Sequence, residues 1–67
     1  MTISEHIKAK RKEFGLTKVE LSERAGVGLR FVRELERGKS TVRLDKVNMV
    51  LKLIGEELQP AKIDMTL

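Results

Sequence analysis

Apolar residues recur at helical spacing in four separate stretches of this chain. In the first stretch, Ile3, Ile7 and Phe14 fall on one side of a helix that begins after Thr2. Gly15 follows directly and offers the left-handed backbone conformation with which many helices end. The pattern therefore predicts an amphipathic helix over most of the first fifteen residues.

A second apolar stretch begins at a sequence signal for a helix start. Thr17 and Glu20 have the spacing of a capping box, in which the hydroxyl and the carboxylate each accept a hydrogen bond from a backbone amide. Leu21 and Ala25 then face inward, and Gly26 supplies a tight turn because a positive φ costs glycine little. We expect a short helix that ends at this turn.

The third stretch predicts a helix from about Gly28 to Arg37. Val32 and Leu35 are its inward positions, and Phe31 packs at the edge of the core. Two short helices that meet across a tight glycine-containing turn have the arrangement of a helix-turn-helix, whose second helix enters a groove of DNA.

The last stretch predicts a fourth helix over residues 44–54, with apolar residues at helical spacing, namely Leu44, Val47, Val50, Leu51 and Ile54. A different element follows it. Residues 56–59 lie between Gly55 and Pro60, so we expect an extended segment or short strand there. A lone strand lacks hydrogen-bond partners, and a second copy of the chain supplies them most simply, by two-fold pairing. The predicted fold is all-α, with a domain over residues 1–55 and a dimerising tail over residues 56–67.

Charge and composition add to this picture. The 67 residues carry 14 Lys and Arg against 10 Asp and Glu, a net charge of +4 that suits a polyanionic partner. Residues 56–67 hold three acids and one base, so the excess positive charge belongs to residues 1–55. The chain has no cysteine and no long apolar segment, so we expect a small cytoplasmic domain without disulfides or a membrane span.

Three short motifs resemble the Cro/CI-type (XRE) helix-turn-helix family. They are GLT at residues 15–17, LSERAGV at residues 21–27 and ERG at residues 36–38. The resemblance covers about residues 7–55 and implies a lambda-repressor-like bundle of four short helices that binds DNA. Two positions depart from the family pattern: Lys18 replaces a frequent glutamine, and Gly28 replaces the usual serine or threonine before the third helix.

A narrower resemblance is to the HipB-type antitoxin branch of that family. It is carried by KAKRKEFGLT at residues 8–17, LERGKSTVRLDKV at residues 35–47 and VLKLIGEEL at residues 50–58. It implies a homodimeric repressor that binds an inverted-repeat operator, regulates its own operon and pairs with a HipA-type toxin. The alternatives are a stand-alone phage or restriction-modification regulator and a protein-interaction module without DNA binding.

The docking geometry of a helix-turn-helix indicates which residues touch DNA. The first residues of the third helix meet base edges, which assigns base contacts to Leu29, Arg30 and Arg33. Arginine binds guanine O6 and N7 in a bidentate manner, whereas leucine offers only apolar contact. Phosphate contacts are expected from Thr17, Lys18, Gly28, Arg37, Lys39, Ser40, Thr41 and Arg43. The alternative for each is an ordinary solvated side chain.

The remaining polar residues have other predicted roles. Family positions imply a structural ion pair between Arg11 and Glu36. The expected pairing of the short strand with a second copy assigns dimerisation to Glu56, Glu57, Leu58 and Gln59. His6 is the only histidine, so it is expected to have a surface role, with neither a metal site nor a catalytic triad. We expect no enzyme activity, no cofactor and no small-molecule ligand.

Overall fold

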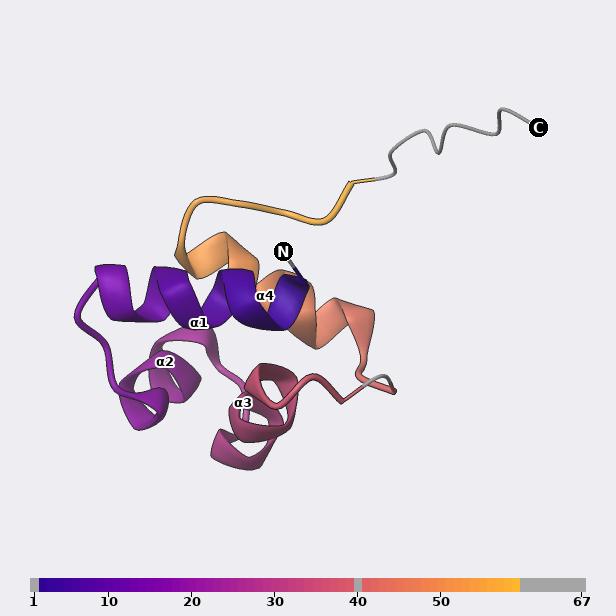
Figure 1. Cartoon of the computed structure of the whole chain (residues 1–67), viewed down its shortest axis with the longest axis horizontal. Coiled ribbons are helices and arrows are strands. Elements are labelled where there is room, and N and C mark those ends of the chain that lie inside the picture. Colours follow the sequence, from indigo (N-terminus) through magenta and orange to yellow (C-terminus); the bar gives the residue numbers. More distant parts are fainter. Residues whose placement is uncertain (1, 40, 60–67) are drawn as a thin grey trace.

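Four short helices make up the regular structure of the residues that the structure describes (Figure 1). The computed structural model describes residues 2–39 and 41–59. The helices are α1 (Ile3–Glu13), α2 (Lys18–Ala25), α3 (Leu29–Glu36) and α4 (Leu44–Leu53). This result confirms the predicted all-α class and the four helices. In the part of the chain that is described, no helix is long and apolar enough to cross a bilayer.

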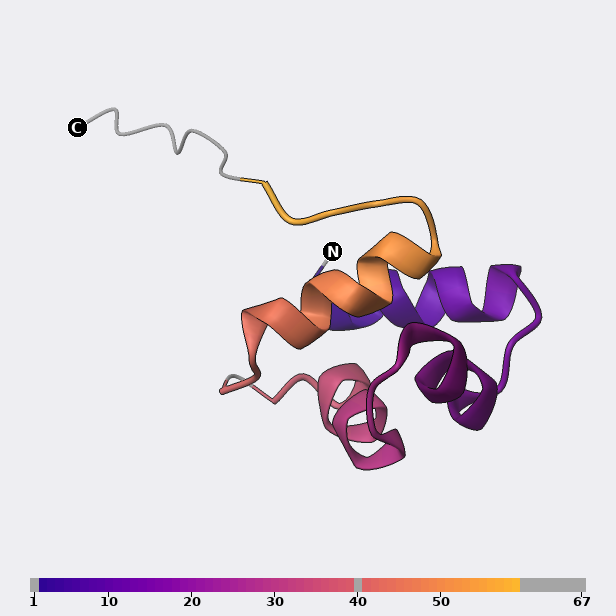
Figure 2. The same ribbon diagram turned by 180° about the vertical axis from the view of Figure 1, so that it is seen from behind.

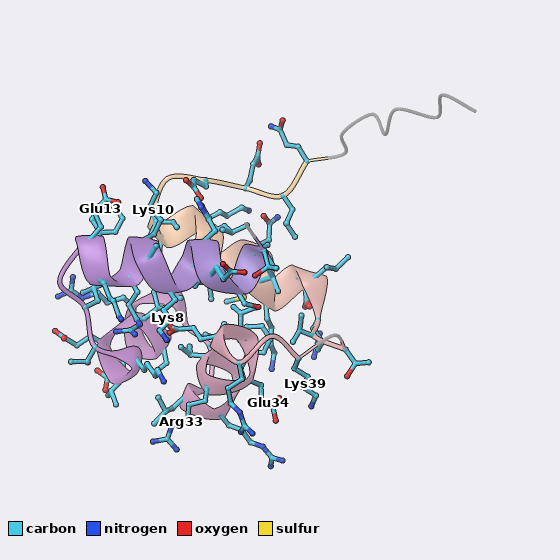
Figure 3. The ribbon with its side chains drawn as sticks, viewed as in Figure 1. Lys8, Lys10, Glu13, Arg33, Glu34 and Lys39 are labelled. Carbon is cyan, nitrogen blue, oxygen red and sulfur yellow. The ribbon has the colours of Figure 1, made fainter. Side chains whose placement is uncertain are left out.

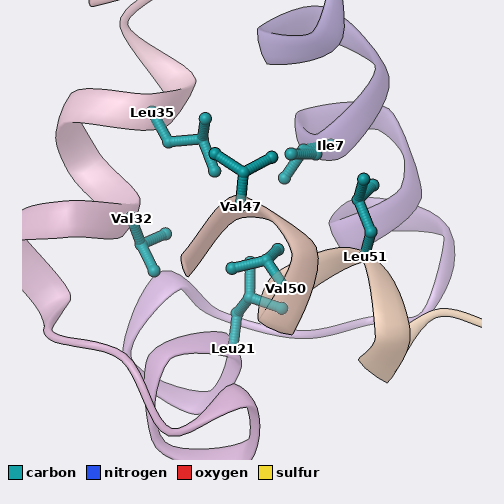
Figure 4. Close-up of a cluster of buried hydrophobic side chains, with 7 residues drawn as sticks. All are labelled: Ile7, Leu21, Val32, Leu35, Val47, Val50 and Leu51. Atoms are coloured by element: carbon teal, nitrogen blue, oxygen red, sulfur yellow. The ribbon is translucent and has the colours of Figure 1, made fainter. Parts of the chain in front are cut away.

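A single apolar core joins all four helices. Figures 1 and 2 place α2 and α3 on one side of the molecule, beneath the level of α1 and α4. The buried side chains, each at most 4% exposed, meet between these levels and are Ile7, Leu21, Val32, Leu35, Val47, Val50 and Leu51 (Figure 4). Isolated helices shorter than about 12–15 residues are marginal in water, so this shared core is what keeps these helices folded.

Three apolar residues at helix ends do not enter the core as their spacing predicts. Phe14 is 53% exposed because α1 ends at Glu13 and Phe14 lies beyond its last turn. Ile3 and Leu44 are the first residues of their helices and are 39% and 70% exposed. A periodic pattern assumes that the helix continues past each residue, and this assumption fails at the ends.

The turn between α2 and α3 combines two glycines with different roles. Gly26 has a φ of +75°, and a Cβ added there would lie 3.5 Å from the Cε of Met49. Gly28 is the N-cap of α3 with a φ of −72°, and apart from its two chain neighbours no described residue has an atom within 4 Å of a Cβ built on it. The backbone therefore requires glycine at the first position only.

The capping box at the start of α2 forms as expected. The Thr17 amide donates to Glu20 Oε1 at 3.0 Å, and the Glu20 amide donates to Thr17 Oγ1 at 3.1 Å. The hydrogen bond from the Thr17 backbone, followed by that from its side chain, holds the pKa of the Glu20 carboxyl below its usual value.

The segment after α4 is held against the helices at several points. Residues 56–59 form no strand within the described chain, so strand pairing with a second copy stays a prediction. The Leu58 amide donates to Asn48 Oδ1 at 2.9 Å, and the Leu58 side chain packs against the core. His6 pairs with Glu56 and is half-buried, so its role extends beyond the surface role expected of it.

Replacing Gly28 should stabilise the domain, and the same change at Gly26 should destabilise it. Gly28→Ser adds an N-cap hydroxyl and reduces the freedom of the unfolded chain, together about 0.5–1 kcal/mol. Gly26→Ser forces an L-residue into the left-handed region, which costs about 1–2 kcal/mol. Urea unfolding followed by circular dichroism measures both, and equal effects of the two substitutions would contradict this account.

Acid should remove the contribution of the Glu20 charge to stability. Because folding lowers the pKa of Glu20, its ionised form stabilises the fold above the unfolded pKa, and this is lost as pH falls through the folded pKa. Glu20→Gln keeps an acceptor for the Thr17 amide but has no charge to lose. Wild type should melt at a higher temperature than the variant near pH 7, and the two melting curves should converge as pH falls below the lowered pKa of Glu20 in the folded state. A difference in melting temperature that stays constant with pH would refute this role of the Glu20 charge.

Candidate DNA-binding interface

Helix α3 has one face in the core and one in solvent. Val32 and Leu35 are at most 1% exposed. On the outer side, the Arg30 side chain is 92% exposed, and Arg33 is also exposed and points away from the body of the molecule (Figure 3). The half-exposed Leu29 lies in the first turn of the same helix. The three residues predicted to contact bases therefore lie on one helix whose buried side is already occupied.

A buried ion pair attaches α3 to α1. The Nε of Arg11 donates to Glu36 Oε2 at 2.8 Å, and Nη2 donates to Oε1 at 3.2 Å. Nη1 donates to the carbonyl of Leu16 at 2.8 Å, so the guanidinium also holds the loop before α2. The side chains are 11% and 2% exposed. This contact is directional, so it fixes how α3 is rotated relative to α1.

The N-terminus of α2 offers fewer free amides than expected. The capping box already uses the amides of Thr17 and Glu20, and the Glu20 carboxylate places a negative charge at this helix end. The amides of Lys18 and Val19 have no hydrogen-bond acceptor in the described chain. A phosphate at this position would therefore be bound by these two amides and the Lys18 side chain, because the Thr17 hydroxyl already donates to the Glu20 carboxylate.

The predicted phosphate contacts after α3 lie at its C-terminal end and in the loop that leads to α4. Arg37 and Thr41 are exposed, whereas Ser40 lies outside the described residues. Lys39 Nζ lies 3.2 Å from Glu34 Oε2. Arg43 donates to both carboxylate oxygens of Asp45, at 3.2 and 2.8 Å. Two of the predicted cations are thus already paired with carboxylates.

Those pairings shift the titration of the carboxyl groups. The hydrogen bond from Lys39, followed by that from Arg30, lowers the pKa of Glu34. The hydrogen bond from the Arg43 side chain likewise lowers the pKa of Asp45. Both carboxylates are ionised at neutral pH and reduce the positive charge that this surface presents.

A surface hollow of about 340 Å³ lies between α3 and the start of α4. It is lined by Gly28, Arg30, Phe31, Glu34, Thr41, Val42, Arg43 and Lys46. Lys46 lies with its Nζ 5.8 Å from the centre of the Phe31 ring. Sequence reasoning assigned no role to Lys46 or Glu34. The spacing of Arg30 and Glu34 by four residues was a visible signal, whereas the approach of Lys46 to Phe31 depends on tertiary packing.

This surface presents cationic side chains and backbone amides, which bind anions and hydrogen-bond acceptors. Among residues 2–39 and 41–59, no three His, Asp or Glu side chains are grouped so that they could hold a metal ion. The exposed groups are guanidinium, ammonium and hydroxyl donors on and beside a short helix. Such donors bind phosphates and the acceptor atoms of base edges.

Comparison with known proteins agrees with this geometry. The sequence is 51% identical over 45 residues to a protein of Sinorhizobium fredii (strain NBRC 101917 / NGR234) described as an uncharacterized HTH-type transcriptional regulator, y4mF. The aligned stretch covers 67% of this chain and 59% of that relative, so the chain spans less than two thirds of its length. The sequence model of the helix-turn-helix family matches residues 7–60, which include α2, α3, α4 and most of α1. The chain therefore belongs to the helix-turn-helix family.

Proposed function

We propose that this protein is a sequence-specific DNA-binding transcriptional repressor that inserts α3 into the major groove. The single observation that carries the proposal is the division of α3 into a buried face and an outer face with two exposed arginines. Membership of the helix-turn-helix family and the description of its relative support DNA-binding transcription regulation in general.

Base recognition falls to the outer side of α3. Arg30 and Arg33 present guanidinium groups that suit guanine O6 and N7, and Leu29 suits a thymine methyl group. Phosphates would be bound on one side of α3 by the amides of Lys18 and Val19 at the start of α2. On the other side they would be bound by the end of α3 and the loop after it, through Arg37, Lys39, Thr41 and Arg43. Lys46 joins the second group, because it borders the same hollow as Arg43.

We further propose that the repressor acts as a homodimer on an inverted repeat. Two copies related by a two-fold axis would place their recognition helices about 34–36 Å apart, one turn of DNA. Residues 56–59 are the proposed contact. Because the Leu58 amide is bound to Asn48, the amides of residues 57 and 59 would point the opposite way in an extended strand, towards a partner.

The finer role that we favour is that of an autoregulating HipB-like antitoxin. It is supported by the sequence resemblance at residues 8–17, 35–47 and 50–58. In this role the protein would repress its own operon and bind a HipA-type toxin. Co-purification with the product of the adjacent gene tests the toxin partner separately from DNA binding.

Selection of bound duplexes from a random pool tests the proposed function directly. Enrichment of an inverted repeat is expected. The logarithm of the association constant should fall by about 0.9 per log unit of salt for each phosphate that the protein neutralises. A chain that enriches no sequence, yet remains folded, would instead be a protein-interaction module.

Removal of the Arg33 guanidinium should relax specificity at one base pair. Arg33→Ala is expected to lose about 1–3 kcal/mol of discrimination there, because its bidentate contact disappears. The fold should remain intact, since Arg33 is exposed. Gel-shift titration with single-base operator variants measures the effect. Arg24→Ala removes an equal charge from exposed α2 surface and serves as the control. Unchanged operator binding by Arg33→Ala would reject the assignment.

A proline at position 59 should weaken dimerisation. Gln59→Pro removes the amide that strand pairing would use, whereas Gln59→Ala keeps it. Deletion of residues 56–67 should weaken the dimer as well, but it also removes Leu58 from the core. Sedimentation at micromolar concentration compares the variants. If Gln59→Pro sediments as the wild-type dimer does, the interface lies elsewhere, and α4 is the next candidate.

A further inference from the structure

The Glu34 carboxylate connects two cations of the proposed DNA surface. Its Oε1 accepts a hydrogen bond from Arg30 Nε at 3.2 Å, and its Oε2 accepts one from Lys39 Nζ at 3.2 Å. Each oxygen therefore serves a different partner. Glu34 borders both the hollow that contains Arg30 and a second hollow lined by Arg37, Gly38 and Lys39.

Backbone hydrogen bonds fix the position of Lys39 relative to Glu34. At the C-terminus of α3, the Lys39 amide donates to the Glu34 carbonyl at 3.1 Å, and the Gly38 amide donates to the Leu35 carbonyl at 3.2 Å. This pair of bonds is the Schellman arrangement. It returns the chain over the last turn of the helix, so the Lys39 side chain starts close to the carboxylate that it binds.

This second partner distinguishes Glu34 from an ordinary residue on a helix surface. An isolated Arg–Glu pair with arginine first in the sequence is the weaker of the two orientations at this spacing. The Glu34 side chain is only 24% exposed, and Lys39 has already restricted its freedom. Arg30, whose side chain is 92% exposed, thus meets a carboxylate that is held in place.

We propose that Glu34 is a positioning residue that orients the Arg30 guanidinium for base recognition; the inference rests on the proposed DNA-binding function. Glu34 engages the Nε–H of Arg30 and leaves the four N–H groups on Nη1 and Nη2 free. These are the donors that an end-on bidentate contact with guanine requires. The orientation is set before DNA arrives, so less freedom is lost on binding.

Glu34 also weakens the binding of DNA in general, and this second effect makes the proposal testable. A carboxylate on this surface repels phosphates of every sequence, whereas an oriented Arg30 favours only sites with guanine at the right position. Glu34 therefore lowers the affinity for DNA in general and raises the preference for the operator. A residue that merely stabilised the helix would produce neither of these opposite effects.

Glu34→Ala tests this role through base preference. Arg30→Ala and Arg33→Ala first identify, by single-base operator variants, the base pair that each arginine reads. Glu34→Ala should then lower the preference at the Arg30 base pair about two- to fivefold and leave that at the Arg33 base pair unchanged. Its affinity for random duplex should rise about two- to fivefold, because one phosphate-repelling charge is gone.

Two matched variants separate orientation from charge. Glu13→Ala removes a carboxylate that pairs with Lys10 on α1, far from α3, and should alter neither quantity (Figure 3). Asp45→Asn frees the cation of Arg43 and should raise the affinity for all duplexes without changing base preference. Glu34→Ala is expected to remain folded, because alanine is the best helix former, and circular dichroism checks this.

The outcomes distinguish this inference from the proposed function. If wild type binds no selected duplex, both are overturned. If wild type binds its operator but Glu34→Ala behaves as Asp45→Asn does, with unchanged base preference, only the positioning role is overturned. Equal losses of base preference at the Arg30 and Arg33 base pairs would also overturn the positioning role, because they would indicate a general displacement of α3.

Discussion

The orientation of α3 depends on the ion pair between Arg11 and Glu36. Two apolar side chains, Val32 and Leu35, hold this helix in the core, but apolar contacts are not directional. The guanidinium adds two bonds to Glu36 and one to the Leu16 carbonyl, with all three donors at defined angles. Removal of one partner from such a buried pair costs about 3–5 kcal/mol. The ion pair therefore determines the direction in which the outer face of α3 points.

Charge on the outer surface is balanced more closely than the net charge suggests. Carboxylates of Glu34 and Asp45 lie among the cations of α3, the loop after it and the start of α4. Arg33, Arg37 and Lys46 are the exceptions, since none of them has an ion-pair partner within residues 2–39 and 41–59. We infer that phosphate binding would exchange carboxylate partners for phosphate at some positions, while Arg37 and Lys46 would gain a partner outright.

The sequence predicted the helices and the core well, and the polar contacts only in part. Periodic apolar positions and terminating glycines determine helix existence, and all seven core residues lie at such positions. Phe14 and Leu44 were placed wrongly because periodicity does not locate helix ends. The contacts of His6 with Glu56 and of Leu58 with Asn48 join residues far apart in the chain. No local pattern contains them, since they depend on how the helices pack.

In α3, the positions that support folding are separate from those that face outward. Val32, Leu35 and Glu36 hold the helix in place, while Arg30 and Arg33 contribute nothing to the core. Variation at the outer positions is therefore nearly independent of folding, so new operator preferences are accessible through changes that the domain tolerates. A library randomised at the outer positions alone would sample binding specificities on a constant scaffold, which makes this small domain a practical starting point for altered recognition.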